Sequence, residues 1–367
     1  MKIKILHCLL SQNIGGIETF LINVLRRIDK NDFYIDFISE CETPAYNDEI
    51  RSLGSNIYQL PPRRKHPLQH RKMLYKLIHE NNYNIIHVHK NSLADISAFT
   101  VCKRARVKSV IAHSHSSSTL TKIFHLLHLV NRKKIRRIAK YYFACNELAG
   151  RWLFGNKLYN EGNITIVSNA IDIDRFAFCQ KTRDNVRRAL GLQDNFVIGH
   201  VGRFISNKNH EFLIKLFLIA HKINPSSVLM LVGEGEVKTK IEKLVLQNGI
   251  SDSVIFTGER NDVSELYQAM DVFVLPSFYE GMPVAAIEAQ AAGLPCLLSN
   301  SISNEIALTS LVKQLEMNNL DIWLDAIKNT KKIENRENCN KRIIEERYDI
   351  SSTVSKLEQL YRSFAYD

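Results

Sequence analysis

The chain has 367 residues, of which 45% are hydrophobic and 24% charged, and its formal net charge is +11. This length predicts two globular domains, and the composition excludes a disordered or low-complexity chain. No uncharged run approaches the roughly 18 residues of a membrane span. We therefore expect any contact with a membrane to be peripheral.

Short apolar runs alternate with amphipathic stretches through the first half. The basic and then apolar start resembles a signal peptide, but its apolar run ends too early, so it predicts a strand. The repeated strand–helix order predicts a parallel sheet with helices on both faces. The predicted strands are 3–10, 33–38, 84–89, 109–113 and 141–145, and the predicted helices are 18–28, 68–80, 93–104 and 121–139.

The same alternation restarts in the second half. The sequence therefore predicts an α/β fold of two doubly wound, Rossmann-like domains that face a cleft, since ligands bind at the carboxyl ends of such strands. We place the domains at 1–167 and 168–349, and expect a last helix, 350–367, to pack back on the first domain. The later strands are predicted at 196–201, 227–232, 254–257, 272–275 and 295–299, and the helices at 210–221, 238–248, 263–270 and 284–292.

The excess positive charge lies in two clusters of the first half. Such clusters attract phosphates or anionic lipid headgroups, although two solvated helical faces explain them equally well. No nucleic-acid recognition motif accompanies them, so no nucleic-acid partner is predicted. The clusters are Arg63, Arg64, Lys65, Arg71 and Lys72, and Arg132, Lys133, Lys134, Arg136, Arg137 and Lys140.

The cysteines are odd in number, scattered and never spaced as C-x-x-C. This usage predicts reduced thiols in a cytosolic protein, with neither a disulfide framework nor a zinc site. They are Cys8, Cys41, Cys102, Cys145, Cys179, Cys296 and Cys339.

Glycines and cations follow three of the predicted strands. Gly15 and Gly16 open the first helix, where a glycine turn and a helix N-terminus suit a phosphate, although a plain tight turn is the alternative. Arg203 and Lys208 follow the strand 196–201, a natural place for a diphosphate clamp or for an ordinary surface loop. Gly233 ends the next strand, where glycine allows the chain to turn abruptly.

The strongest pair of candidate residues is Glu280 and Glu288. They flank Gly281-Met282-Pro283, and Pro283 favours the start of a helix near Met282. Carboxylates at such a junction suit sugar or ribose hydroxyls, and the helix start suits phosphate, so together they favour a nucleotide-sugar. The alternative makes Glu280 a capping acid and Glu288 a buried polar residue.

Two H-x-H pairs lie at strand ends, His87 with His89 and His113 with His115. The members of each pair point to the same side of the sheet. No acidic or cysteine residue is placed to complete a metal site, so no metal is predicted. The histidines are either structural or donors of hydrogen bonds to a sugar in the cleft.

Taken together, these residues resemble retaining glycosyltransferases of family 4, with the GT-B fold, and most of all the bacterial exopolysaccharide and capsule enzymes. The similar blocks keep the family's order over residues 15 to about 300. They are Gly15-Gly16-Ile17-Glu18, Ala112-His113-Ser114-His115, Asn169-Ala170-Ile171-Asp172, Gly202-Arg203 with Lys208, Gly233-Glu234-Gly235, Pro276-Ser277, Glu280-Gly281-Met282-Pro283, and Glu288-Ala289 through Gly293-Leu294-Pro295.

The resemblance implies a role for each candidate in binding the donor. Arg203 and Lys208 would grip the diphosphate, and Glu288 would hold the ribose hydroxyls. Glu280 would face the donor sugar, and Gly233 would line the same site. The helix that begins at Met282 would offer its positive end to phosphate.

On the opposite wall, the resemblance implies that Gly15 and Gly16 approach the diphosphate. One histidine would contact the transferred sugar, with His115 favoured over His113. The sequence departs from the family in two places. Ala170 stands where the family often has glycine, and Ser116 follows His115 where an acid is usual.

The implied activity is transfer of a hexose or N-acetylhexosamine from a nucleotide-sugar, with a UDP-sugar favoured, to a glycan acceptor. The N-terminal domain would bind that acceptor, with a polyprenyl-diphosphate-linked one favoured, during surface polysaccharide synthesis. The resemblance also implies no metal or other cofactor, and a cytoplasmic protein at the inner membrane face. The residues alone leave open an epimerase and a non-catalytic nucleotide-sugar-binding module.

Overall fold

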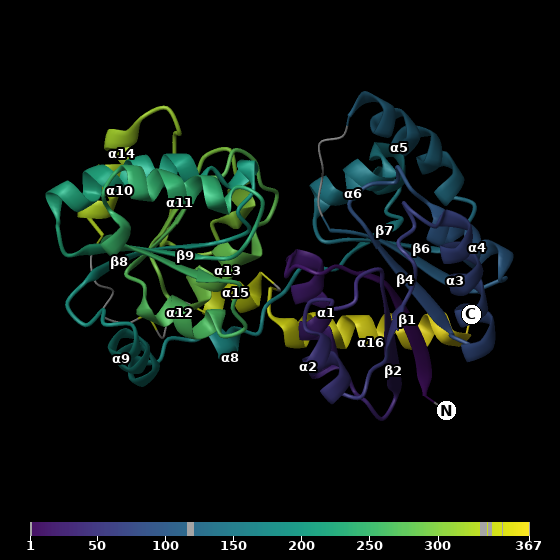
Figure 1. Ribbon diagram of the computed structural model, residues 1–367. Helices are drawn as coiled ribbons and strands as arrows, with labels where there is room; N and C mark the ends of the chain where they lie inside the picture. The colour runs from purple at the N-terminus through teal and green to yellow at the C-terminus, as the bar shows by residue number, and fades with distance from the viewer. Residues whose placement is uncertain (1, 116–120, 331–335, 337–339, 347, 367) are drawn as a thin grey trace. The chain divides into compact units, whose positions relative to one another are not determined.

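The computed structural model describes residues 2–115, 121–330, 336, 340–346 and 348–366. It divides the chain into two compact units (Figure 1). Unit 1 comprises Met1–Ala170 together with Ile350–Asp367, and unit 2 comprises Ile171–Asp349. The division falls shortly after the boundary expected from the sequence. Ser116 and Cys339 lie outside the described residues.

Unit 1 is built on a parallel sheet. Its strands are β1 (Ile3–Leu10), β2 (Phe33–Ser39), β3 (Ile57–Gln59), β4 (Ile85–Lys90), β5 (Ser109–Ser114), β6 (Tyr141–Ala144) and β7 (Ile164–Ile166). Among the described residues the seven strands pair in parallel in the order β3-β2-β1-β4-β5-β6-β7. Strands β1, β4 and β5 are almost wholly buried, as expected in the middle of a parallel sheet with both faces covered.

Helices cover both faces of this sheet (Figure 1). Helices α1 and α16 contact each other, and their apolar residues, with Phe20 and Tyr361 among them, share a core with Ile5 of β1. Leu74 of α3 and Phe99 of α4 belong to a second core cluster. The helices are α1 (Gly16–Arg27), α2 (Asn47–Ser52), α3 (Pro67–Asn81), α4 (Ser97–Arg104), α5 (Lys122–Ile135), α6 (Glu147–Phe154), α7 (Asn156–Asn160) and α16 (Ile350–Tyr366).

Unit 2 repeats this plan. Its strands are β8 (Phe196–Val201), β9 (Ser227–Val232), β10 (Val254–Gly258), β11 (Val272–Leu275), β12 (Cys296–Ser299) and β13 (Val312–Leu315). In the described part of the unit these six strands pair in parallel in the order β10-β9-β8-β11-β12-β13. The predicted fold class, two doubly wound Rossmann-like domains, is confirmed.

Two apolar clusters form the core of unit 2. One contains Tyr267 and Ile287, and the other contains Phe217 and Trp323. The helices are α8 (Ile173–Phe176), α9 (Gln180–Ala189), α10 (His210–Ile223), α11 (Lys238–Gln247), α12 (Val263–Ala269), α13 (Val284–Ala291), α14 (Leu320–Lys328) and α15 (Lys341–Glu345), with the short 3-10 turns Ser206–Lys208, Ser251–Ser253 and Asn304–Ile306.

The strand order of unit 2 fixes where a ligand can bind. From β8 the chain builds one side of the sheet through β9 and β10, and then returns to place β11 on the other side of β8. The carboxyl ends of β8 and β11 therefore flank a topological switch point, where open α/β sheets bind their ligands. The predicted donor residues of unit 2 follow β8, β9 and β11.

Two further observations concern the thiols and the helices of the described residues. The six cysteines of the described chain, from Cys8 to Cys296, are free thiols. Across the same described ranges, no helix combines the length and the hydropathy required to cross a lipid bilayer.

Candidate donor-binding site

The loop after β8 carries the two predicted cations. The backbone N–H of Gly202 donates to the carbonyl of Val232 (3.0 Å), which continues the pairing of β8 with β9. Arg203 is exposed, and its guanidinium has no hydrogen-bond or ion-pair partner among the described residues. Lys208 ends the turn Ser206–Lys208 before α10, and its side chain is largely buried. The loop thus holds one cation free at the surface and one packed against the protein.

Lys208 forms an ion pair that spans the switch point. Its Nζ lies 2.5 Å from Oε1 of Glu280, and the hydroxyl of Ser277 donates to the same oxygen (3.2 Å). The backbone N–H of Phe278 donates to the carbonyl of Asn207 (2.9 Å), so the loops after β8 and β11 are joined directly. The structure therefore brings together Lys208 and Glu280, and their roles toward the diphosphate and the donor sugar stay predictions.

The loop after β9 approaches this site backbone to backbone. Gly233 and Gly235 have φ angles of 136° and 154°, a region that favours glycine. A Cβ on Gly233 would lie 2.3 Å from the carbonyl oxygen of Gly202, and one on Gly235 would lie 2.5 Å from that of Phe204. Both positions thus require glycine, which explains the Gly233-Glu234-Gly235 block.

The helix expected near Met282 begins slightly later. Pro283 is the N-cap of α13, and the helix runs from Val284 to Ala291. Gly281 and Met282 therefore belong to the loop that leads into it. The positive end of α13 follows Glu280 in the chain and lies beyond the carboxyl end of β11, where a phosphate is favoured.

Glu288 lies in the second turn of α13 and is 9% exposed. Its Oε2 accepts a hydrogen bond from the hydroxyl of Tyr267 (3.0 Å). Burial raises the pKa of Glu288 from 4.5 to about 7, and the Tyr267 hydrogen bond and the charge of Arg175 oppose that rise. A carboxyl with this pKa changes its charge near neutral pH.

Gly15 and Gly16 belong to unit 1, where they begin α1. Gly15 is the N-cap, with φ −141° and ψ 179°. The carboxylate of Glu18, in the first turn, accepts hydrogen bonds from the backbone N–H (3.1 Å) and hydroxyl (2.7 Å) of Ser11. Glu18 therefore stabilises the turn between β1 and α1. The approach of Gly15 and Gly16 to a diphosphate stays a prediction.

A row of buried imidazoles lies in the sheet of unit 1. Nδ1 of His115 contacts the amide oxygen of Asn169 (2.9 Å), Nδ1 of His89 contacts Nε2 of His115 (2.7 Å), and Nδ1 of His7 contacts Nε2 of His89 (2.8 Å). Because the amide oxygen accepts, each Nδ1 carries the proton and each Nε2 accepts. This row of hydrogen bonds forms with all three rings neutral. Both ring nitrogens of His115 are thus engaged within unit 1.

A second row runs beside the first. Nδ1 of His87 contacts the hydroxyl of Tyr361 (2.8 Å), and its Nε2 contacts Nδ1 of His113 (3.1 Å). Burial lowers the pKa of His7 to about 3 and that of His115 to about 4, and it holds the pKa values of His87, His89 and His113 well below 6.5. All five rings are therefore neutral at physiological pH.

Two triads of this cluster have ring nitrogens within 4.8 Å of one another, His7-His87-His89 and His89-His113-His115. That spacing is within the reach of a metal ion. In the described residues no Asp, Glu or Cys joins either triad, and most of the ring nitrogens bond to one another instead. The absence of a metal from the mechanism stays a prediction.

Sequence comparison identifies the family. The family described as Glycosyltransferase Family 4 matches residues 14–175, and the one described as Glycosyl transferases group 1 matches residues 182–344. Putative glycosyltransferase EpsF of Bacillus subtilis is 34% identical over 336 residues, which cover 88% of this chain and 86% of that protein. The chain belongs to glycosyltransferase family 4. It is a glycosyltransferase, so the epimerase and binding-module alternatives are wrong.

Another relative and a solved structure extend the comparison of this glycosyltransferase. The UDP-Gal:alpha-D-GlcNAc-diphosphoundecaprenol alpha-1,3-galactosyltransferase of Escherichia coli is 28% identical over 389 residues, covering 98% of this chain and 97% of that one. The crystal structure of Anabaena Alr3699/HepE with UDP and glucose aligns with a TM-score of 0.79 and 18% identity, over 99% of this chain and 100% of that one. The structural likeness confirms the GT-B fold.

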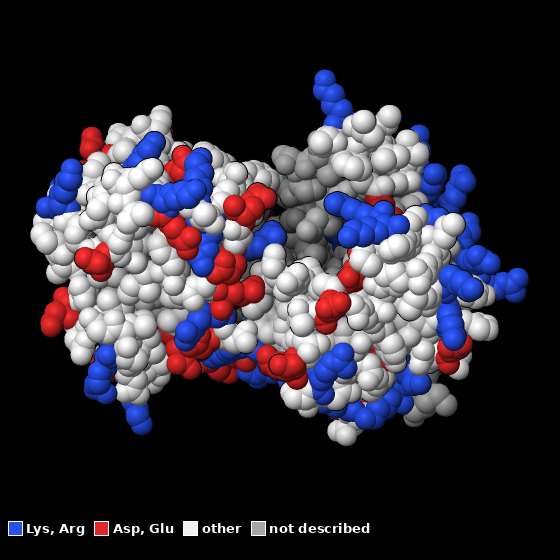
Figure 2. Space-filling model, in the orientation of Figure 1, with Lys and Arg blue, Asp and Glu red and all other residues white. Residues whose placement is uncertain are grey.

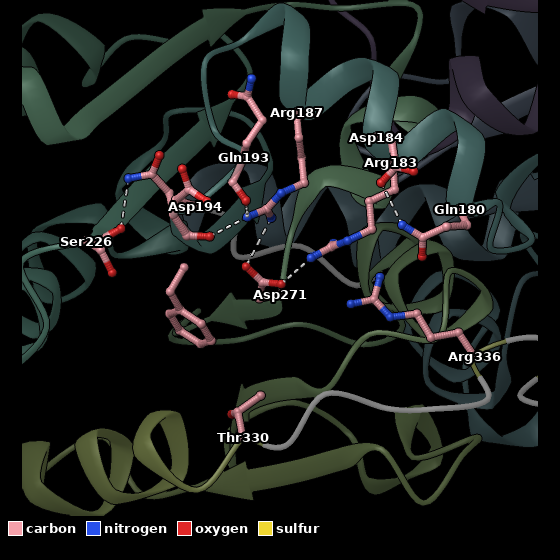
Figure 3. Close-up of a pocket in the computed structure, with 12 residues that line it drawn as sticks. Gln180, Arg183, Asp184, Arg187, Gln193, Asp194, Ser226, Asp271, Thr330 and Arg336 are labelled. Atoms are coloured by element: carbon pink, nitrogen blue, oxygen red, sulfur yellow. Dashed lines mark hydrogen bonds and ion pairs between the residues drawn. The ribbon is translucent and has the colours of Figure 1, made fainter.

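The glycosyltransferase also has a polar cavity of about 480 Å³ in unit 2 (Figure 3). Arg183 and Arg187 of α9 both pair with Asp271, which accepts from the N–H of Val197 (2.8 Å). The same guanidiniums donate to the carbonyls at the end of α12, among them that of Ala269 (2.8 Å). Phe196 and Ser226, which line the cavity, lie where β8 and β9 begin, so it is at the sheet edge opposite to the donor residues.

Some residues of the site carry no signal in the sequence. Tyr267 lies in an ordinary amphipathic helix, and Ser277 is one hydroxyl in a loop. The sequence around them therefore does not indicate that each bonds to a carboxylate. Asn169 lies in a block that the sequence analysis quotes, but its contact with His115 depends on the fold. Ala170, which replaces the family's glycine, does not have a positive φ and packs in the core of unit 1, so the exchange is accommodated.

Proposed function

We propose that this glycosyltransferase acts with retention of configuration and moves a hexose or an N-acetylhexosamine from a UDP-sugar. Its acceptor would be a glycan carried on polyprenyl diphosphate, in the synthesis of a surface polysaccharide. The observation that carries the donor proposal is the Lys208–Glu280 pair at the switch point of unit 2, on a loop that also carries the exposed Arg203. The E. coli relative named for UDP-Gal and a diphosphoundecaprenol supports the donor and the acceptor.

In the proposed mechanism the bond from the anomeric carbon to the phosphate oxygen breaks while the acceptor hydroxyl attacks from the same face. The acceptor proton goes to the leaving phosphate oxygen, so no separate base is needed. Arg203, Lys208 and the N–H groups at the start of α13 stabilise the charge on the departing diphosphate, without a metal. Glu280 holds Lys208 in place before the donor arrives and then faces the sugar, while Glu288 accepts from the ribose hydroxyls.

The decisive test compares Lys208→Ala with Lys240→Ala. Lys240 also pairs with a glutamate, Glu211 (2.5 Å), but on the exposed surface of unit 2. We expect Lys208→Ala to lower turnover of the UDP-sugar about 10²-fold, the scale of losing one preorganised donor to the departing charge. Lys240→Ala should leave it unchanged. Equal rates for folded Lys208→Ala and the parent protein would remove Lys208 from the clamp.

The donor and the stereochemistry need two further measurements. A thermal-shift screen of UDP- and GDP-sugars identifies the nucleotide, and a shift with GDP-sugars alone would contradict the UDP proposal. Proton NMR of the glycan formed gives the anomeric configuration. An inverted linkage would contradict retention.

We further propose that α5 docks on the anionic inner face of the plasma membrane. Polar side chains of this helix face the protein interior. The N–H of Leu93 donates to Nδ1 of His128 (3.1 Å), and the side-chain amide of Asn131 donates to the carbonyl of Leu93 (2.8 Å). Six large apolar side chains are exposed instead, with Ile123 at 74% and Leu126 at 63%. Such a helix suits the boundary between headgroups and acyl chains.

The distribution of charge also supports docking on an anionic membrane. The basic cluster from Arg132 to Lys140 begins in the last turn of α5, and Lys and Arg greatly outnumber Asp and Glu in unit 1 but not in unit 2. Figure 2 shows blue side chains gathered over the part of unit 1 where Figure 1 labels α3, α4 and α5, with few red ones among them. Anionic lipid attracts such a surface by about 1 kcal/mol per cation close to it.

Flotation with vesicles of phosphatidylglycerol and phosphatidylethanolamine tests the docking. We expect the protein to float at low salt, and the variant Ile123→Ser/Leu126→Ser to lose most of this binding. Leu246→Ser is the control, because Leu246 is equally exposed (71%) but lies on α11 of unit 2. Failure to float, or the same loss in both variants, would leave α5 as an ordinary surface.

A further inference from the structure

The ribose-binding carboxylate proposed above has a buried partner, Tyr267. This side chain lies in α12 and is 0% exposed. The centroid of its ring lies 5.8 Å from that of Phe176 and 5.9 Å from that of Phe273. Its hydroxyl oxygen lies 3.0 Å from Oε2 of Glu288 and 2.9 Å from the carbonyl oxygen of Ala285. Because the ring is packed on several sides, the hydroxyl is held at one place beside the carboxyl.

The hydroxyl has one hydrogen and two acceptors within reach. When Glu288 is ionised, the hydrogen points to Oε2, since a charged acceptor gives the stronger bond. When Glu288 is protonated, its own hydrogen can point to the tyrosine oxygen, and the tyrosine hydrogen turns to the carbonyl of Ala285. In either arrangement the tyrosine hydrogen has an acceptor, and a hydrogen bond joins the hydroxyl to Oε2 of Glu288. The carboxyl can therefore change its charge without any movement of heavy atoms.

The other groups that face the pair are few among the described residues. Arg175 of α8 favours the ionised carboxyl through its charge, and Cys296 of β12 lies near Tyr267. Arg175 is also bound to the carbonyl of Asn261 (2.7 Å), which limits its approach. Tyr267 is thus the neutral donor that bonds directly to the carboxylate.

We propose that Tyr267 is the positioning residue for nucleotide recognition: it fixes one oxygen of Glu288 and keeps the carboxylate charged, so that it can accept from both ribose hydroxyls. This rests on the proposed role of Glu288. A protonated carboxyl would turn one of its oxygens into a donor and lose one of the two ribose contacts. Burial already brings the pKa of Glu288 to about 7, so loss of the Tyr267 hydroxyl leaves the acid form dominant at neutral pH.

The test measures UDP affinity by calorimetry between pH 6 and pH 9. We expect the affinity of the parent protein to fall as the pH drops below about 7. For Tyr267→Phe we expect a displacement of the pH profile by about one unit, which corresponds to about fivefold weaker binding at pH 7, and recovery at pH 9. The ionisation of UDP itself affects both proteins equally, so the displacement between the two profiles is the measured quantity.

Tyr83→Phe is the matched control. Tyr83 is also a buried tyrosine that donates to a carboxylate, Oδ2 of Asp36 (2.7 Å), but it lies in unit 1. Its profile should coincide with that of the parent protein. A Tyr267→Phe profile that is not displaced, or a loss of affinity that is the same at every pH, would overturn the inference.

A double-mutant cycle separates positioning from simple packing. In a Glu288→Gln background, removal of the Tyr267 hydroxyl should cost no further UDP affinity, because both changes act through one carboxylate. An equal cost in both backgrounds would mean that Tyr267 acts through packing alone. If Tyr267→Phe does not fold, a carbon-13 NMR titration of Glu288 decides: a midpoint near 4.5 in the parent protein would overturn the inference.

The same titration distinguishes failure of the inference from failure of the proposed function. If the parent protein binds no UDP but the Glu288 midpoint rises in Tyr267→Phe, the donor assignment is wrong and the coupling of the two side chains stands. If UDP binds and the midpoint does not move, the role of Tyr267 is wrong and the donor assignment stands.

Discussion

Glu288 illustrates how a binding residue lowers the stability of its own fold. A buried carboxyl prefers to be neutral, and its pKa of about 7 measures that preference against the ordinary 4.5. The unfolded chain loses this proton near pH 4.5, whereas the folded chain keeps it until about pH 7. The contribution to stability is therefore complete below pH 4.5 and is lost as the pH rises through 7.

Glu288→Gln should consequently stabilise the protein in alkaline buffer while it weakens UDP binding. The shift corresponds to roughly 3 kcal/mol at most. We expect the unfolding midpoint of Glu288→Gln to exceed that of the parent protein more at pH 8 than at pH 5. Glu305→Gln, at an exposed position, should show no such difference. An advantage for Glu288→Gln that is the same at both pH values would contradict this account.

At this scale the sequence predicts residues whose chemistry stands out. Lys208 and Glu280 can be recognised because a cation and an acid each follow a strand, and the structure joins them in an ion pair. Tyr267 cannot be recognised, because its partner lies 21 positions away on another helix. The alternation of His113 and His115 predicts that they share a face, but not that their ring nitrogens bond to other side chains.

Among the elements, the buried apolar strands are predicted well, including the four-residue strands β6, β11 and β12. Strands β3, β7 and β13 are missed, because they are short edge strands that are mostly not fully buried. Helix α9 is missing from the predicted helices, since its sequence is very polar and its one buried residue is Arg187. Its place is set by the pairs with Asp271 rather than by apolar packing, so hydrophobic periodicity gives no sign of it.

Helix α5 shows a different limit of the pattern. Apolar residues at helical spacing predict a helix there, and the structure has one from Lys122 to Ile135. The pattern also favours an apolar face turned inward, whereas His128 and Asn131 are buried and six of the large apolar residues are exposed. The reason is specific hydrogen bonding: both inward side chains bond to the backbone around Leu93.

The imidazole rows of β1, β4 and β5 make unit 1 sensitive to acid. A histidine with a lowered folded pKa stabilises the fold above pH 6.5 and loses that contribution as the pH falls toward the folded value, at about 1.4 kcal/mol per pH unit for each ring. We expect unit 1 to unfold cooperatively below about pH 6, measured by circular dichroism. His7→Phe should reduce the proton uptake on unfolding by about one.

His79→Gln is the control for this experiment, because His79 is exposed on α3 and should not change the uptake. The result that would refute the explanation is an unchanged proton uptake in His7→Phe. Acid unfolding would then have to come from other groups.

At the scale of the molecule, the restart of the strand–helix alternation correctly predicts two doubly wound units. The sequence also places most positive charge in the first of them, while the acids of unit 2 slightly outnumber its cations. What the sequence does not give is the pairing of strands, since β1 lies between β2 and β4 only because the chain returns to it. That return creates the switch points, and the site depends on them.

Helix α16 has a consequence for how the protein is made. It supplies Leu357 and Tyr361 to the core of unit 1, yet the whole of unit 2 precedes it in the sequence. A ribosome synthesises the chain from its N-terminus, so one face of the unit 1 sheet stays uncovered by α16 until residues beyond 349 emerge. All the strands of unit 2 have been synthesised by then. We therefore expect the half of the enzyme that is translated first to finish folding last.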